Sequence, residues 1–459
     1  MLLSPASPPQ STPLREMLRL ALPITLVQVG LMLMGVTDTV IVGRVSAVAL
    51  ASVALGNLYF FVISVFGMGV LMALDPIVAQ AVGAGDRPAV ARALQRGFLL
   101  AAAISLLTSL LFAPAERVFA ALGQPAEVTP MAAAFVRASI PGTLPFFAFI
   151  VLRQSLQALG RTGPILVSIL IANIANIALD LILVFGRFGL PALGGVGSAW
   201  ASSASRWVML AVLLAAAWRP IAGAMLPLRR EAVEAAPLGR MIRVGVPIGA
   251  QGVLEYGVFA LVAILMGRIG AAEVAAHQVA INIASLTFMV PLGVGAAAAV
   301  LVGRAVGRGD AAAARSYARA ALACGALFMS CTGALFLLAP GVLARLYTTQ
   351  APVIALASLL IPLAGVFQIF DGVQAVAAGV LRGLGDTLVP LVVNILGFWL
   401  IGLPVSLYLG FRAGMGPLGL WWGLVVGLAV VAVVNVLRVR VRLKRDLRRL
   451  VINEEPIAA

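Results

Sequence analysis

Long apolar stretches, separated by short polar or glycine-rich segments, run along almost the whole chain. We count twelve stretches long enough to cross a hydrocarbon layer, which takes about 20 residues of helix. Backbone groups in lipid must bond within their own segment, and short strands with the alternating polarity of a closed barrel are missing. The pattern predicts twelve transmembrane helices, at residues 17–41, 50–77, 94–112, 131–155, 164–186, 194–218, 242–266, 275–302, 317–338, 353–380, 388–410 and 417–438.

The composition supports an all-α membrane protein. Of the 459 residues, 62% are hydrophobic and only 11% are charged, so little of the chain remains for a soluble domain. Motifs for an enzyme are also missing: there is no phosphate-binding Gly-Lys-Ser loop and no His/Cys cluster with zinc-ligand spacing. We therefore expect neither catalysis, nor a cofactor, nor a metal framework.

The positive charges predict the orientation of the chain. With the N-terminus in the cytoplasm, 24 of the 32 Lys and Arg residues fall on the cytoplasmic side and six on the external side. Cytoplasmic loops of membrane proteins carry such an excess, so both termini are expected to be cytoplasmic. The net charge of +15 then reflects topology and attraction to anionic lipid headgroups, and it requires no nucleic-acid partner.

The second half of the chain repeats the first. A constant shift of 224 residues pairs Pro23 with Pro247, and the glycine-rich segment 82–86 with 306–310. Each half holds six spans, so the repeat is parallel, and two such bundles can rock about a central cleft. We expect a disordered cytoplasmic tail at 1–16, a six-helix lobe at 17–218, a cytoplasmic linker at 219–241, a six-helix lobe at 242–438 and a basic cytoplasmic tail at 439–459.

Five carboxylates interrupt these apolar spans. An ionised side chain at the centre of a transmembrane helix costs roughly 2.5–3.5 kcal/mol, so acids at that depth usually face a cavity or a partner. The repeat does not reproduce them: Asp38 aligns with Val262 and Glu255 with Leu31. We interpret them as groups that handle a proton, a metal ion or a cationic ligand. The five are Asp38, Asp75, Asp180, Glu255 and Asp371.

Each acid has a functional and a structural interpretation. Glu255 and Asp371 lie near the middle of their spans, where they either reach a cavity or are protonated and packed against a carbonyl. Asn176 and Asp180 share one helix face through their i, i+4 spacing, which offers oxygens for a proton network or a cation. Asp75, close to the cytoplasmic end of its span, is expected to form a local ion pair with a basic loop or to act in gating.

Three other residues within the predicted spans have alternative interpretations. Arg206 is the deepest cation in a span and either pairs with an acid or serves packing. His277, at the external start of its span, is expected to be a structural cap or polar contact. Pro23 removes a backbone donor, so helix 1 has either a static kink or a hinge there.

Several motifs together resemble those of the multidrug and toxic-compound extrusion (MATE) family, in its NorM-like bacterial branch. They follow the family's order over nearly the whole chain. They are Val36-Thr37-Asp38-Thr39, Gly83-Ala84-Gly85-Asp86, Asn176-Ile-Ala-Leu-Asp180, Ala275-Ala276-His277-Gln278, Phe288-Met289-Val290-Pro291-Leu292-Gly293 and Phe370-Asp371 through Thr387.

The resemblance implies two lobes around a central cleft and export of cationic or amphipathic drugs in exchange for Na⁺ or H⁺ across the bacterial inner membrane. By motif, Glu255 and Asp371 correspond to the second-lobe cation site. Phe367 stands where some Na⁺-coupled relatives have Tyr, which weakens the case for Na⁺ in that lobe. Asp38, Asn176, Asp180 and Ser202 correspond to the first-lobe network, Na⁺ could bind in either lobe, and Pro23 falls at the family's proposed hinge.

Two rival functions stay open. A flippase for lipid-linked sugars should line its cleft with several basic groups, whereas the deep charges here are mainly acidic. A passive cation channel would conduct without exchanging protons for drug. One chain holds both halves of the cleft, so a monomer suffices.

Overall fold

The computed structural model describes residues 12–452, and these residues form helices joined by short loops. Twelve helices or helix pairs in this range are long and apolar enough to cross a membrane, which confirms the predicted number of spans. Most of the expected tail at 1–16 lies outside the described residues. Its last four residues do not belong to a tail, because α1 already begins at Pro13.

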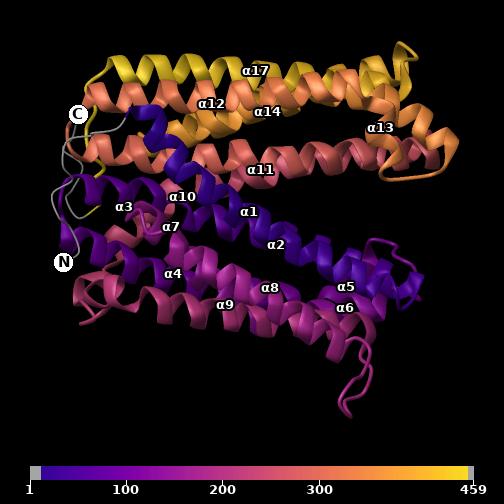
Figure 1. Ribbon diagram of the computed structural model, residues 1–459, viewed down its shortest axis with the longest axis horizontal. Helices are drawn as coiled ribbons and strands as arrows, with labels where there is room; N and C mark the ends of the chain where they lie inside the picture. The colour runs from indigo at the N-terminus through magenta and orange to yellow at the C-terminus, as the bar shows by residue number, and fades with distance from the viewer. Residues whose placement is uncertain (1–11, 453–459) are drawn as a thin grey trace.

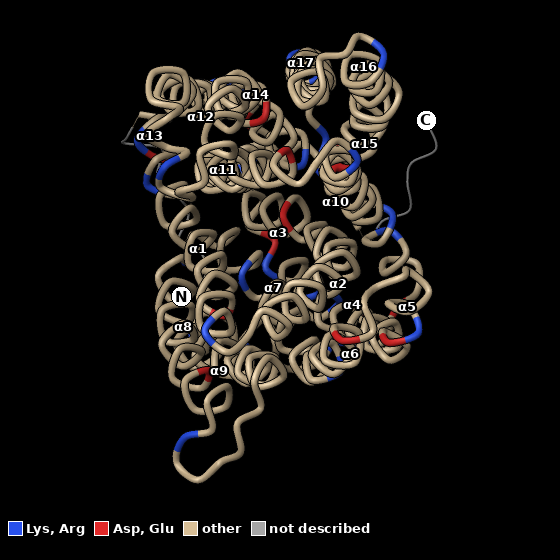
Figure 2. Tube along the Cα trace, turned by 90° about the vertical axis from the view of Figure 1, so that its right-hand side faces the viewer, with Lys and Arg blue, Asp and Glu red and all other residues tan. Residues whose placement is uncertain are grey.

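The helices of the N-terminal half, α1 to α9, lie beside those of the C-terminal half, α10 to α17, as two groups (Figures 1 and 2). The N-terminal half contains α1 (Pro13–Val42), α2 (Ala47–Leu71), α3 (Leu74–Gly83), α4 (Arg87–Phe112), α5 (Ala115–Ala121), α6 (Thr129–Ala138), α7 (Thr143–Ala158), α8 (Gly163–Leu183) and α9 (Gly194–Met225). The C-terminal half contains α10 (Ala235–Ile269), α11 (Ala271–Gly307), α12 (Ala311–Leu338), α13 (Pro340–Arg345), α14 (Ala351–Gly383), α15 (Leu388–Asn394), α16 (Leu403–Leu407) and α17 (Gly416–Lys444). Short 3₁₀ turns lie at Ile140–Gly142 and Arg230–Val233, and wider π-helical turns at Ile395–Gly402 and Tyr408–Arg412.

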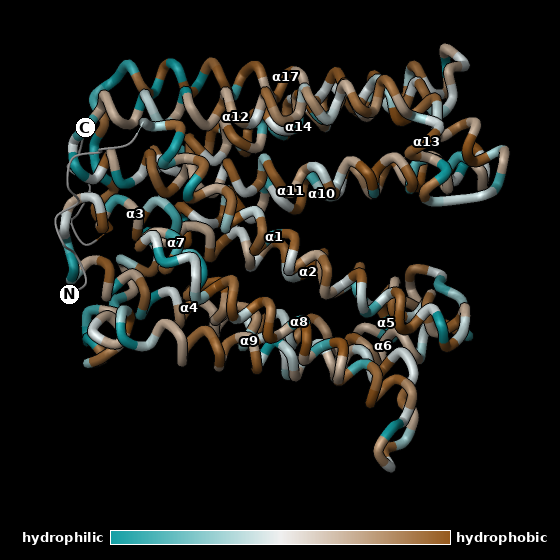
Figure 3. The backbone as a smooth tube through the Cα atoms, in the orientation of Figure 1, coloured by the Kyte–Doolittle hydropathy of each residue, from teal (hydrophilic) through white to brown (hydrophobic). Residues whose placement is uncertain are grey.

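The helices turn apolar side chains outward and place their few polar groups inside. On α8, Asn176 and Asp180 belong to the buried face, while Leu170 and Ile174 on the other face are 64% and 60% exposed. A soluble protein would show the opposite arrangement, so these exposed side chains fit a lipid environment. Between its two ends the molecule is accordingly mostly hydrophobic along its helices, and hydrophilic positions lie at both ends but are more numerous at one of them (Figure 3).

That end is where α1 begins and α17 ends, and we call it the terminal end (Figure 1). α9 continues to Met225 and α10 starts at Ala235, so the segment between these helices is shorter than the expected linker at 219–241. α17 continues to Lys444, and residues 445–452 then run along the terminal end without regular structure.

The predicted span at 50–77 is two helices. α2 ends at Leu71 and α3 begins at Leu74, with Asp75 and Pro76 in the first turn of α3. Pro76 has no backbone N–H, so its place in a first turn leaves no helical hydrogen bond unmade. The corresponding helix of the second half, α11, runs unbroken from Ala271 to Gly307.

Two pairs of close helix crossings join the halves and obey the 224-residue repeat. A Cβ atom on Gly69 of α2 would lie 2.3 Å from Cα of Gly249 on α10. Its counterpart Gly293 on α11 packs closely on Thr25 of α1: a Cβ atom on Gly293 would lie 2.9 Å from Cα of Thr25. The four positions are related by the shift, since 69 + 224 = 293 and 25 + 224 = 249.

The second pair lies at the terminal end. Cβ atoms on Gly83 and Gly307 would lie 2.1 Å from the Arg304 carbonyl oxygen and 2.0 Å from the Gln80 carbonyl oxygen, respectively. These positions also match the shift, since 83 + 224 = 307 and 80 + 224 = 304. Only glycine permits such backbone contacts, so the two halves meet at this end along a pseudo-twofold axis.

α1 crosses from one half to the other, as Figure 1 shows. Its first turns pack with helices of the C-terminal half, where Met17, Ala21 and Ile24 share a core with α11 and α12 residues. Its later part packs against α8 in the N-terminal half. The helix therefore begins at the terminal end, passes between the two halves, and ends inside the N-terminal half.

Candidate functional site

A cavity of about 460 Å³ lies between the halves. α2 of the N-terminal half contributes Phe61 and Val65, and the rest of the wall belongs mainly to the C-terminal half. Phe61 approaches Tyr256 of α10 with 4.9 Å between ring centroids, so aromatic side chains of both halves meet at the cavity. The remaining lining residues are Met72, Ile248, Gln251, Gly252, Glu255, Phe259, Ser285, Phe288, Met289, Leu292, Gln374, Ala375, Ala378, Arg382, Thr387 and Pro390.

Glu255 is the acid of this cavity wall among the described residues. Its Oε2 accepts a 3.4 Å hydrogen bond from Asn394 Nδ2 of α15, and the amide of Gln374 on α14 lies nearby. Asp371 is buried one turn before Gln374, close enough for its charge to interact with that of Glu255. The structure therefore brings Glu255 and Asp371 together, with Glu255 facing the cavity.

Phe367 and His277 belong to an aromatic cluster in the C-terminal half. The Phe367 ring makes edge contacts at 5.8 Å with Phe259 and with Trp421, and it brings no oxygen to the nearby acids. His277 is 2% exposed within α11, with its ring 5.7 Å from Trp421. The sequence suggested a structural cap or a polar contact for His277; it is not a helix cap, because α11 already begins at Ala271.

The acids of the N-terminal half form a second cluster inside that half. Asp38 of α1 accepts a 2.7 Å hydrogen bond from Ser202 Oγ of α9. Asn176 and Asp180 of α8 lie close to Asp38, and all four residues are at most 5% exposed. None of the four lines the large cavity.

Many polar atoms of this second cluster have no hydrogen-bond partner among the residues that the structure describes. They are Asp38 Oδ1, both side-chain polar atoms of Asn176 and both carboxylate oxygens of Asp180. Buried polar groups in proteins are almost always satisfied, so a cluster of free oxygens indicates a place for a proton, an ion or water. These are the oxygens that could hold a small cation.

Arg206 of α9 lies above the aromatic rings of the N-terminal half rather than in an ion pair. Its guanidinium carbon is 4.2 Å from the Phe60 centroid and 5.3 Å from the Phe146 centroid. Its charge also interacts with that of Asp38. The cation-π contacts and the nearby acid together make a buried cation tolerable.

Asp75 has a different partner from the one expected. Arg382 of α14 approaches it, with 3.9 Å between Nη1 and Oδ2, and Arg153 of α7 also lies near. Both arginines come from transmembrane helices, not from a basic loop, and Arg382 belongs to the opposite half. The sequence placed Arg382 in a loop because the predicted span ended at 380, whereas α14 continues to Gly383.

Pro23 lies inside α1, which stays helical through it.

Two residues that contact the cavity acid Glu255 were missed from the sequence, Asn394 and Gln374. Both are polar residues at positions of apolar spans, the same signal that identified Asn176 and Asp180. Their contact with Glu255 depends on how α14 and α15 approach α10. The spacing of residues within one helix gives no information on that approach.

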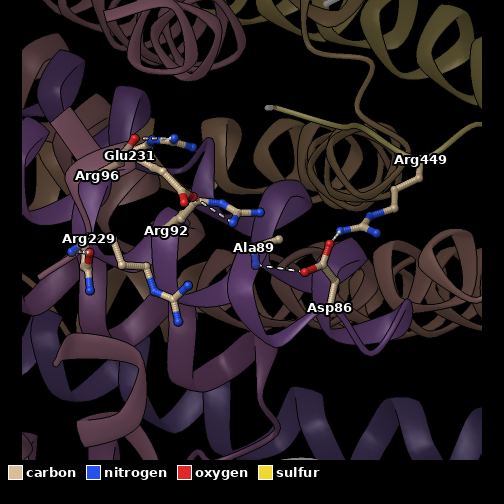
Figure 4. A network of polar contacts seen from close by, with 8 residues as sticks. Asp86, Ala89, Arg92, Arg96, Arg229, Glu231 and Arg449 are labelled. Carbon is tan, nitrogen blue, oxygen red and sulfur yellow. Dashed lines mark hydrogen bonds and ion pairs between the residues drawn. The ribbon is translucent and has the colours of Figure 1, made fainter. Parts of the chain in front are cut away.

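The terminal end carries a network of ion pairs (Figure 4). Arg449 of the C-terminal segment lies 2.7 Å from Asp86, which also accepts a 2.9 Å hydrogen bond from Ala89 N at the start of α4. Partial burial alone would raise the pKa of Asp86, but the bonds to Arg449 and Ala89 hold it below its usual value. Arg92 pairs with Glu231 at 3.0 Å in the same region.

Comparison with known proteins agrees with this architecture. The MatE family model matches residues 23–182 and 247–408, which together make up more than half of the chain, and 23 + 224 = 247. A probable multidrug resistance protein NorM of Bradyrhizobium diazoefficiens is 38% identical over 438 residues, 94% of each chain. The multidrug resistance protein MdtK of Edwardsiella ictaluri is 35% identical over 438 residues, 93% of this chain and 95% of that protein.

A solved structure shows the same fold. The crystal structure of the eukaryotic MATE transporter AtDTX14 superposes with a TM-score of 0.85 and 24% identity, over 94% of this chain and 97% of that one. The predicted fold class of twelve helices in two six-helix lobes is confirmed. The chain therefore belongs to the MatE family; it is a multidrug efflux transporter and a multi-pass protein of the bacterial inner membrane, and is not an enzyme.

Proposed function

We propose that this protein exports organic cations and cationic amphipathic drugs in antiport with H⁺ or Na⁺. The observation that carries the proposal is the position of Glu255, a carboxylate in the wall of an otherwise mainly apolar and aromatic cavity between two pseudo-symmetric halves. The volume of this cavity, about 460 Å³, falls in the range of sites that bind drug-sized molecules. Phe61, Tyr256 and Phe288 offer ring faces to a bound cation, and Glu255 supplies the opposite charge.

The coupling ion is assigned to the cluster in the N-terminal half. Asp38, Asp180 and Asn176 leave several buried oxygens unsatisfied, and Ser202 orients one of the carboxylates. Asp371, behind Glu255, is the alternative acid for the ion in the C-terminal half. If ion and drug favour different conformations, each lowers the affinity for the other by the same factor.

The terminal end is proposed to face the cytoplasm, since 24 of the 32 Lys and Arg residues gather there or in loops expected on that side. The contacts at Gly83 and Gly307 then close the cytoplasmic side of the cleft in this conformation. Pro23 is proposed as a hinge of α1, because this helix contacts both halves. A monomer holds the complete cleft.

The test is drug efflux from liposomes with a Na⁺ gradient and a pH gradient imposed separately. We expect one of the two ion gradients to drive ethidium out of the liposomes against the ethidium concentration gradient, and Glu255→Gln to abolish this efflux. The control is Glu273→Gln, which changes an acid in the first turn of α11, outside the cavity wall. Equal transport by wild type and Glu255→Gln, or ethidium movement only down its own gradient, would reject the proposal.

The flippase alternative is not favoured. A lipid-linked pyrophosphate needs several basic groups in the cleft, whereas Arg382 is the one cation in the cavity wall among the described residues, and the same wall contains the acid Glu255. The same experiment tests the channel alternative, because a passive channel would let ethidium move only down its own gradient.

A further inference from the structure

Five charged side chains lie in and beside the cavity wall: Glu255 and Arg382 line the cavity, and Asp75, Arg153 and Asp371 are buried. Arg382 of α14 has Asp75 of α3 at 3.9 Å and also feels the charge of Glu255. The charge of Arg153 of α7 also acts on Asp75, and the charges of Glu255 and Asp371 interact. Figure 2 shows charged positions at this boundary between the two groups of helices, around α3.

Arg382 is the connecting member of this group. Its side chain is 12% exposed and lines the cavity together with Glu255, while its Nη1 donates a hydrogen bond to Met72 Sδ of the N-terminal half at 3.5 Å. The distance to Asp75 is long for a hydrogen-bonded ion pair, and the charge of Glu255 also acts on the guanidinium. Since its described hydrogen bond is to Met72, the guanidinium is free to shift toward either acid.

The group is anchored in the N-terminal half. Arg153, 7% exposed, donates a 3.1 Å hydrogen bond to Gln28 of α1. Asp75 lies in the first turn of α3, directly after the break that separates α3 from α2. Its position relative to Arg382 therefore follows any movement of α3 against α14.

The repeat does not reproduce this group. With the 224-residue shift Asp75 aligns with Ala299, and with the shift of 225 that aligns Leu159 with Leu384, Arg382 aligns with Gln157. The glycine contacts around it are present in both halves, so closure of the terminal end does not itself require charges. The charges must serve something that the symmetric scaffold lacks.

We propose that Arg382 is a positioning residue of the transport cycle, which transmits occupancy of Glu255 by a cationic substrate to Asp75 and so strengthens closure of the terminal end. While Glu255 is charged and free, the guanidinium is shared between Glu255 and Asp75. Once a cation neutralises Glu255, Arg382 is attracted to Asp75 alone, and the attraction between the halves increases. This inference rests on the proposed function, because it assigns the substrate cation to Glu255.

The experiment measures the populations of closed and open terminal ends in the full-length protein. Spin labels are placed at Arg161→Cys and Ala312→Cys, exposed positions at the terminal end in opposite halves, after Cys324→Ser and Cys331→Ser. Distances between the labels are recorded with and without ethidium, and ethidium binding is followed separately by its fluorescence anisotropy.

We expect ethidium to increase the closed fraction of the wild type and Glu255→Gln to do the same without ethidium. Asp75→Asn should lower the ratio of closed to open forms about fivefold or more, as for other couplings between sites. In Arg382→Gln, ethidium should still bind but no longer change the distances, and Arg382→Lys should restore part of the response. A purely structural role would not separate binding from the conformational response.

A double-mutant cycle of Glu255→Gln and Asp75→Asn decides the matter. The two effects should be strongly non-additive, and this coupling should vanish in Arg382→Gln. Asp386→Asn is the matched control, since Asp386 is a buried acid paired with Arg438 and Arg442 inside one half. Additive effects, or a distance change on ethidium binding in Arg382→Gln, would overturn the proposal while leaving gradient-driven efflux standing.

Discussion

At the scale of single residues, Ser202 offers the sharpest test of the N-terminal cluster. Its hydroxyl donates a 2.7 Å hydrogen bond to a carboxylate that is 3% exposed. A hydrogen bond to a charged group contributes about 1.5–3 kcal/mol, so Ser202→Ala should weaken coupling-ion affinity by about tenfold or more. The measurement is the ion concentration that gives half-maximal ethidium efflux from liposomes.

The neighbouring residue supplies the control for Ser202. Ser203 is equally buried, but its hydroxyl donates to the Ala138 carbonyl oxygen at 2.8 Å. Ser203→Ala should leave the half-maximal ion concentration unchanged, and Ser202→Thr should keep it near the wild-type value. Equal half-maximal ion concentrations in Ser202→Ala and Ser203→Ala would show that the hydrogen bond from Ser202 to Asp38 does not contribute to ion affinity.

The site residues differ in how far the sequence could identify them. Asp38, Asp180 and Asn176 stand out because a polar group inside an apolar helix has a high cost and a face that spacing reveals. Ser202 carries no such signal, since a hydroxyl can bond to its own helix, and only the family resemblance pointed to it. Asp75 was recognised, but Arg382 as its partner depends on how two distant helices meet.

At the scale of helices, the glycine contacts at the terminal end should control the closed conformation. A Cβ at Gly307 would lie 2.0 Å from the Gln80 carbonyl oxygen, so Gly307→Ala must push α3 and α11 apart. We expect a shift toward the form open at the terminal end, seen as faster hydrogen exchange of amides in residues 80–86. Gly239→Ala is the control, because no atom lies within 4 Å of its Cβ position. Unchanged exchange in Gly307→Ala would mean that α3 and α11 do not separate there.

The C-terminal segment after α17 joins both halves at the same end. Leu450 N donates a 2.6 Å hydrogen bond to Gln80 Oε1, and Leu450 packs on Gly385 of the C-terminal half. Arg449 reaches Asp86. The sequence predicted only a basic tail here, since no local pattern reveals that an extended segment will contact a helix terminus more than 350 positions earlier.

Asp86→Asn separates the two roles of this residue, because asparagine caps a helix as well as aspartate but cannot form the ion pair. We expect the variant to fold normally and to release the C-terminal segment, measured as increased protease cleavage near Arg449. Asp310 is the control: it is the repeat counterpart of Asp86, and it likewise accepts from a helix-start amide, Ala313 N at 2.8 Å. Equal cleavage of Asp86→Asn and Asp310→Asn would contradict the assignment.

The pH dependence of this contact follows from the lowered pKa of Asp86. A group with a depressed pKa in the folded state stabilises it above its usual pKa of about 3.9 and loses that effect as the pH falls through the depressed value. Cleavage near Arg449 should therefore stay constant between about pH 5 and pH 8. A rise in cleavage as the pH is lowered through that window would mean that Asp86 is not held in its charged form.

Helix positions were predictable and helix breaks were not. The lengths of the apolar stretches predicted the twelve spans, and the repeat predicted which span of one half corresponds to which span of the other. The separation of α2 from α3 and the π-helical turns in the span at 388–410 arise from packing between helices, which leaves no mark in hydropathy.

At the scale of the whole molecule, symmetry and chemistry are divided. The contacts that close the terminal end occur twice, related by the repeat, whereas the acids of both clusters and the charged group around Arg382 occur once. A duplicated scaffold can rock between two equivalent arrangements, and unique charges then decide which arrangement each ligand favours. This division is the reason why we propose the acids that break the repeat as the site residues.

The orientation of the molecule is the remaining prediction at this scale. Phe188 lies in the loop between α8 and α9 at the end opposite the termini, and its side chain is 88% exposed. Arg161, in the loop between α7 and α8, is exposed at the terminal end. With Cys324 and Cys331 replaced by Ser, a membrane-impermeant maleimide should label Phe188→Cys in intact cells and Arg161→Cys only after permeabilisation.

The excess of positive charge at the terminal end requires this result, because retention of Lys and Arg in the cytoplasm orients such proteins. The reverse labelling pattern would place the closed end outside, and the conformation described here would then be the one open to the cytoplasm.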